Sequence, residues 1–181
     1  MTITPQDAEH ALKDIAQVTD RSSILQGYRA ASPMLILWGL VWFIVNVCCD
    51  RWPHLAGRIW MAGDLVGMMG SIYIGTRIKG AQRMQWRYLA TLLVAIGSAV
   101  AAVVLLKVQS TELVTAFFTL VVGSIYMAWG LWRGARIFGL GAVIVMVSML
   151  VGIIQPPHFY LWMAVNGGGA LILAGLWLRR A

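Results

Sequence analysis

Four charged or amide side chains interrupt the apolar stretches of this sequence and are the residues best placed to do chemistry. They are Asp64, Asn166, Asn46 and Arg58. A carboxylate at the centre of a membrane span costs about 2.5–3.5 kcal/mol on insertion scales, so such acids usually face the bundle interior and have a partner. We therefore predict that Asp64 faces the interior and hydrogen-bonds to Asn166, Asn46, Arg58 or a nearby hydroxyl.

Two hypotheses explain this polar cluster. In the first, Asp64 and Asn166 form the proton or cation site of a small transporter or channel. In the second, they form a structural clamp that joins helices through interhelical hydrogen bonds. Asp64 is the only acid deep inside an apolar stretch. Because a proton-coupled transporter normally shows more than one such group, we favour the clamp.

Six apolar stretches must position these residues, and each is close to the roughly 20 residues that cross the hydrocarbon core of a bilayer. The composition agrees, since 60% of residues are hydrophobic and the mean hydropathy is +0.76. The sequence therefore predicts an all-α membrane protein with six transmembrane helices. These are expected near residues 32–49, 56–76, 88–106, 113–132, 137–154 and 159–178.

The net charge of +7 is distributed unevenly between the loops. Eleven of the 14 basic residues fall on one side of the predicted membrane, and only Arg51, Arg58 and Lys107 fall on the other. This asymmetry follows the positive-inside rule and predicts an integral protein of the bacterial inner membrane with both termini in the cytoplasm. Basic residues placed in this way lie at lipid headgroups, which argues against a nucleic-acid partner.

The first 31 residues form a separate segment. Thr4 can cap a helix, Pro5 suits its first position, and apolar residues then recur near helical spacing. We predict a cytoplasmic amphipathic helix over residues 1–31, followed by a six-helix bundle over residues 32–181. This helix either packs beside the bundle, which we favour, or docks a cytoplasmic protein partner.

Short links between the spans predict three consecutive helical hairpins. The sequence Trp60-Met61-Ala62 recurs as Trp162-Met163-Ala164, which aligns Asp64 with Asn166 and suggests a parallel internal repeat. Three tandem hairpins with glycine-spaced helices resemble the layout of small six-span bacterial membrane proteins of the HdeD type. This resemblance concerns architecture and implies no function.

Glycine spacing suggests where helices approach each other. Pairs such as Gly63 and Gly67, or Gly130 and Gly134, permit close helix packing and could also support a homo-oligomer. The run from Gly167 to Gly169 allows either tight packing, which we favour, or a local break in the last span.

No motif for catalysis or for a cofactor stands out. The sequence lacks paired acids, a phosphate-binding glycine loop and a metal-binding HExxH motif, and His54 and His158 have no ligand cluster around them. We therefore expect no enzyme activity, no cofactor and no metal. The favoured function is a structural, stress-related or regulatory membrane component with a cytoplasmic interaction helix. The alternative is a small transporter or channel centred on Asp64 and Asn166.

Overall fold

The computed structural model describes residues 32–77, 86–133 and 135–179, and the elements of these ranges are all helical. They are a first helix (Ser32–Arg51), the short turn η1 (Pro53–Leu55), α2 (Ala56–Arg77), α3 (Trp86–Leu105), α4 (Thr111–Arg133), α5 (Ala135–Ile154), α6 (Phe159–Met163), the π-helical segment η2 (Ala164–Gly169) and α7 (Ala170–Arg179). The last three form one continuous final helix. Each of the six predicted stretches is confirmed as a helix. The amphipathic helix predicted over residues 1–31 lies outside the described residues.

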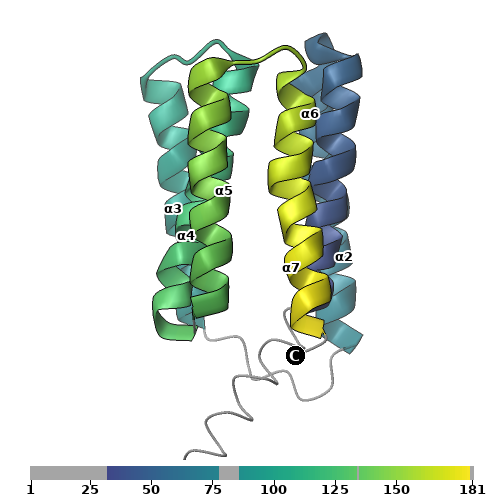
Figure 1. Ribbon diagram of the computed structural model, residues 1–181, viewed down its shortest axis with the longest axis vertical. Helices are drawn as coiled ribbons and strands as arrows, with labels where there is room; N and C mark the ends of the chain where they lie inside the picture. The colour runs from purple at the N-terminus through teal and green to yellow at the C-terminus, as the bar shows by residue number, and fades with distance from the viewer. Residues whose placement is uncertain (1–31, 78–85, 134, 180–181) are drawn as a thin grey trace, which may run out of the picture.

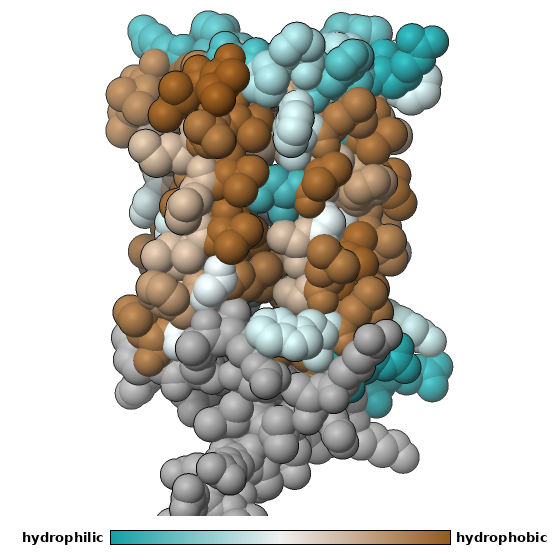
Figure 2. Space-filling view, viewed as in Figure 1, coloured by the Kyte–Doolittle hydropathy of each residue, from teal (hydrophilic) through white to brown (hydrophobic). Residues whose placement is uncertain are grey.

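Four of these helices are long and apolar enough to span a membrane. Their apolar parts are Ser32–Arg51, Thr111–Leu131, Ile137–Ile154 and Phe159–Arg179. The helix α3 has a shorter apolar stretch, and α2 has 22 residues but carries Arg58 and Asp64 in its first half. Figure 2 shows a hydrophobic belt below a hydrophilic upper end, with a few more hydrophilic residues at its lower right edge. The length, apolarity and belt indicate a multi-pass membrane protein, and the six-helix count fits the sequence prediction.

The helices form two groups that stand side by side (Figure 1). One group contains α3, α4 and α5, and we call it the α3–α5 half. The other contains the first helix, α2 and the final helix, and we call it the α2–α7 half. The links after α3 and α5 lie at the upper end of Figure 1, whereas the C-terminus lies at the lower end. Any chemistry in the middle of the bundle therefore depends on what joins these halves.

Glycines bring helix backbones together inside each half. In the α3–α5 half, a Cβ on Gly141 would lie 2.5 Å from the carbonyl oxygen of Gly123 on α4. In the α2–α7 half, a Cβ on Gly168 would lie 2.6 Å from the backbone nitrogen of Phe43 and 2.8 Å from the carbonyl oxygen of Gly39. Both backbone contacts join helices of different predicted hairpins. The repeat of three hairpins thus stays a prediction.

Of the glycines that suggested a homo-oligomer, Gly134 lies outside the described residues, and Gly63, Gly67 and Gly130 pack against helices of the same chain. Gly63 packs on Val45 of the first helix, Gly67 packs on Trp38, and Gly130 packs on the backbone of Phe138. Gly168 packs on the first helix as described above. A contact with a second copy would therefore have to use another face.

Candidate functional site

Asn166 lies at the junction of the two halves and is the most firmly held of the four candidate residues. Its side chain is only 7% exposed. The amide Nδ2 donates to the hydroxyl of Ser148 at 2.8 Å and to the carbonyl oxygen of Ile144 at 3.3 Å, both on α5. These two hydrogen bonds connect the final helix to the α3–α5 half. Interhelical hydrogen bonds of this kind act as polar joints between membrane helices.

The backbone around Asn166 departs from an α-helix. Residues Ala164–Gly169 form a π-helical segment, a rare form that occurs frequently at functional sites. Gly167 faces the ring of Trp42, since a Cβ there would lie 2.7 Å from Cε3, and Gly168 faces the backbone of the first helix. The favoured prediction of tight packing by the glycine run is therefore confirmed, and the π-helical geometry accompanies it.

Asn46 is also buried, but it belongs to a different set of contacts. Its side chain is 1% exposed, and its Nδ2 donates to the carbonyl oxygen of Trp42 at 2.9 Å on the same helix. Its Oδ1 accepts no hydrogen bond from the described residues. Buried polar atoms are normally satisfied, so this oxygen calls for an explanation. No hydrogen bond joins Asn46 to Asn166 or Asp64 in the described residues.

Two buried hydroxyls line α4 beside this region. Thr115 donates to the carbonyl oxygen of Thr111 at 2.9 Å, and Thr119 donates to that of Thr115 at 2.8 Å. Thr119 approaches Gly167, because a Cβ on that glycine would lie 3.8 Å from its Cγ2. Both hydroxyl groups therefore have their hydrogen-bond acceptors within α4 itself. They make the middle of the bundle more polar than its lipid-facing belt.

The prediction that Asp64 faces the bundle interior is wrong for the single chain. Asp64 is exposed, and so is Arg58. Neither side chain makes a hydrogen bond or ion pair with another described residue. The helix α2 instead buries its glycine side, with Gly63 and Gly67, against the first helix. Because successive residues turn by about 100° in a helix, Asp64 falls on the flank of α2 and away from the packed side.

Asp64 lies at the centre of an exposed stripe on α2 that we call the Asp64 seam. Its members are separated by alternating steps of four and three residues, which is the spacing of a helix–helix contact. The exposed members are Gly57, Met61, Asp64, Met68 and Gly75. Ser71 has the same spacing, but it is half-buried and accepts a hydrogen bond from Nε1 of Trp38 at 3.0 Å. Met61 is 69% exposed and Met68 is 55% exposed, and a Cβ on Gly57 or Gly75 would meet nothing within 4 Å.

One polar contact joins the first helix and the final helix at the end of the bundle where α2 begins. His158, at the start of the final helix, lies 3.0 Å from a carboxylate oxygen of Asp50 at the end of the first helix. Sequence reasoning singled out His158 but not this partner. In the described ranges, no group of three or more histidine, cysteine or acidic side chains could hold a metal ion.

Sequence reasoning also missed Ser148, the main partner of Asn166. Nothing distinguishes this serine from other small polar residues in membrane spans, and only the packing of α5 on η2 reveals it. The division of the bundle into two halves was not predicted from the sequence either. Comparisons of the chain with protein-family models, curated proteins and solved structures found no match.

Proposed function

We propose that this chain is a non-catalytic component of a membrane, structural or regulatory in role, that works by associating with a second copy of itself through the Asp64 seam. One observation carries the proposal, namely that Asp64 is exposed among the exposed apolar side chains of Met61, Leu65 and Met68. A carboxylate that faces lipid is expensive. A partner helix that covers Asp64 would remove that cost.

The spacing of the seam favours a second copy as this partner. In a two-fold dimer with both copies in the same membrane orientation, the two α2 helices run parallel and like residues face each other. Asp64 would then face Asp64 of the second copy at equal depth. Two carboxyl groups that face each other in this way can share one proton and form a hydrogen bond, as paired carboxylates do in other proteins.

The other residues of the seam suit such a contact. Gly57 and Gly75 would allow close approach of the helices at both ends of the seam. Met61 and Met68 have flexible side chains that adapt to irregular surfaces. The distance from Gly57 to Gly75 is about 27 Å along the helix, which is most of the thickness of a hydrocarbon core.

We also propose the bacterial inner membrane as the location, with both termini in the cytoplasm. The support is the distribution of 11 of the 14 basic residues on one side. The segment 1–31 would then lie beside the membrane, where it can contact a cytoplasmic protein. A regulatory role would couple this contact to association of the membrane helices.

Energy transfer between two labelled populations of the full-length chain in phosphatidylcholine vesicles tests the proposal. We expect Asp64→Leu to weaken self-association by roughly 5–30-fold, since an interhelical hydrogen bond in a membrane contributes about 1–2 kcal/mol. Asp64→Asn should associate nearly as well as the original chain, because an amide pair still hydrogen-bonds. Equal association of the Asp64→Leu protein and the original chain would refute the proposal.

A second function, a small transporter or channel, is favoured by two features of the bundle interior. These are the π-helical geometry around Asn166 and the unpaired Oδ1 of Asn46. Vesicles that contain the protein should then conduct protons or cations, and Asn46→Ala should strongly reduce the flux while the protein still inserts. Absence of flux in the original chain, or flux unchanged by Asn46→Ala, would reject this function.

A further inference from the structure

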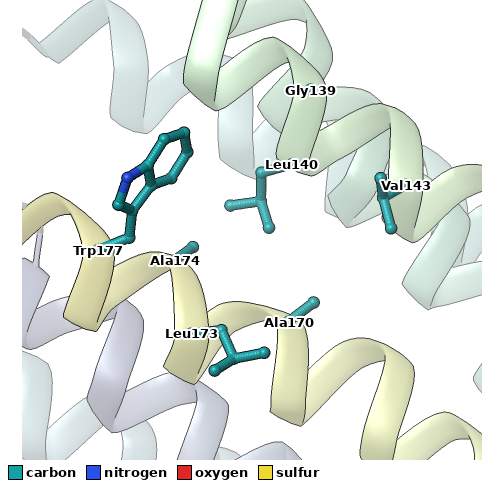
Figure 3. Close-up of a pocket in the computed structure, with 7 residues that line it drawn as sticks. All are labelled: Gly139, Leu140, Val143, Ala170, Leu173, Ala174 and Trp177. Carbon is teal, nitrogen blue, oxygen red and sulfur yellow. The ribbon is translucent and has the colours of Figure 1, made fainter.

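The apolar groove between α5 and α7 and the interior of the α2–α7 half differ in what they offer a ligand. Figure 3 shows the groove, which is lined by residues of both helices, none of them charged. The interior of the α2–α7 half instead contains buried polar atoms without a hydrogen-bond partner among the described residues. Because buried polar groups are nearly always hydrogen-bonded, these atoms point to a bound polar molecule.

Three such atoms lie on three different helices of this half. They are Oδ1 of Asn46 on the first helix, Nε1 of Trp60 on α2 and the hydroxyl oxygen of Tyr160 on the final helix. Asn46 is 1% exposed and Tyr160 is 4% exposed. The hydroxyl of Tyr160 lies near Thr111 of α4, but without hydrogen-bond geometry. An amide oxygen accepts, an indole N–H donates and a hydroxyl does both, so the three groups are complementary and yet do not bond to one another.

The packing of the first helix on α2 places Asn46 and Trp60 at the same level of the bundle. Sγ of Cys49 lies 3.9 Å from the carbonyl oxygen of Ala56. Since the two helices are antiparallel, Trp60, four residues after Ala56, lies level with Asn46, three residues before Cys49. Trp42 connects the two residues. Its carbonyl oxygen accepts the amide N–H of Asn46, and its ring meets the ring of Trp60 edge-on, with centroids 5.8 Å apart.

Tyr160 reaches nearly the same level from the final helix. Gly167 packs on the ring of Trp42. Tyr160 is seven residues before Gly167, and Cys49 is seven residues after Trp42, so Tyr160 lies level with Cys49 in this antiparallel pair. The side chains of Tyr160 and Cys49 are close enough to interact electrostatically. This level is only about 4–5 Å from that of Asn46 along the bundle.

We propose that a water molecule is bound between Asn46, Trp60 and Tyr160 and joins the three helices of the α2–α7 half. It donates to Oδ1 of Asn46, accepts from Nε1 of Trp60 and pairs with the hydroxyl of Tyr160, which makes the three hydrogen bonds typical of a buried water. The indole N–H disfavours a cation, and the amide oxygen disfavours an anion. This site does not depend on the Asp64 seam, which lies on the exposed flank of α2.

A double-mutant cycle on the full-length chain, unfolded by a denaturing detergent, tests the bridge. Asn46→Leu and Tyr160→Phe each remove one partner of the water with little change in side-chain size. We expect both to raise the equilibrium constant for unfolding, and the double variant to be roughly threefold or more stable than the sum of the single effects predicts. Tyr126→Phe on α4 is the matched control. It also removes one hydroxyl, but about 15 Å farther along the bundle, so it should combine additively with Asn46→Leu.

Water at Trp60 is measured directly by NMR of the ¹⁵N-labelled protein in detergent micelles, with Trp60→Phe to assign the indole signal. We expect a direct nuclear Overhauser effect between the indole proton and water, both in the original chain and in Tyr160→Phe, where no tyrosine hydroxyl can relay it. Asn46→Leu combined with Tyr160→Phe should abolish the effect. The proposal is overturned if the cycle is additive, if Asn46→Leu stabilises the protein, or if the Trp60 indole shows no contact with water.

Discussion

Asp64 and Asn166 occupy matching sequence contexts, 102 residues apart, and yet the fold treats them in opposite ways. Counted along their helices, both lie about 10–12 Å from the same end of the bundle. Asn166 is buried and holds α5 through two hydrogen bonds, whereas Asp64 is exposed without a partner in the described chain. Similar depth and similar neighbours in sequence therefore do not determine which side of a helix is packed.

This difference shows which polar residues a single chain can bury and which it leaves exposed for contact with a second chain. An amide is neutral, so the bundle can bury Asn166 at the cost of satisfying its hydrogen bonds. An acid would bring a charge into the same interior, which is far more expensive without a cation. The acid instead lies on a flank of α2, where a second chain can reach it.

The largest effect is expected where backbones touch beside Asn166. Gly168→Ala places a methyl group against the backbone of the first helix, and overpacking of this kind costs about 1–3 kcal/mol. Gly75→Ala on the Asp64 seam meets open space and should leave the monomer unchanged or up to about 1 kcal/mol more stable. Thermal unfolding in detergent at low protein concentration measures both. Equal melting temperatures for the two variants would contradict the described packing.

A smaller effect is expected when each polar side chain is replaced by leucine. Asn166→Leu removes both hydrogen bonds to α5 and should destabilise the monomer by about 1–2 kcal/mol. Asp64→Leu should leave monomer stability unchanged or improve it, because Asp64 makes no hydrogen bond in the described chain. Unfolding of the two variants by a denaturing detergent provides the measurement. A destabilised Asp64→Leu monomer would show that Asp64 has a partner inside its own chain.

The smallest effect concerns the partner of Asn166. Ser148→Ala removes one of the two acceptors but leaves the carbonyl oxygen of Ile144, so we expect a loss of about 0.6 kcal/mol. Ser98 is exposed on α3, and Ser98→Ala serves as the control. If Ser148→Ala lowered the free energy of unfolding as much as Asn166→Leu, the hydrogen bond to Ser148 alone would account for the polar contact between the final helix and α5.

Apolarity and span length were enough to predict the helices, because a bilayer requires about 20 apolar residues for each crossing. The buried state of Asn166 and Asn46 was likewise expected from the cost of polar groups in hydrocarbon. The side of α2 that packs was not predictable. Gly63 and Gly67 determine it through contacts with Val45 and Trp38, and those contacts depend on how the first helix is placed. The pairing of Asn166 with Ser148 depends on the same long-range packing.

The most direct test of the central claim is disulfide cross-linking between copies along α2. In a background without Cys48 and Cys49, single cysteines are placed on the seam at Met61, Met68 and Gly75. The controls are Val66, Met69 and Tyr73, which are exposed on another side of α2. A disulfide needs Cα atoms about 4.4–6.8 Å apart, so a parallel contact at the seam should oxidise efficiently to dimers in native membranes only at the first three positions. Equal cross-linking at both sets, or none at the seam, would contradict the account.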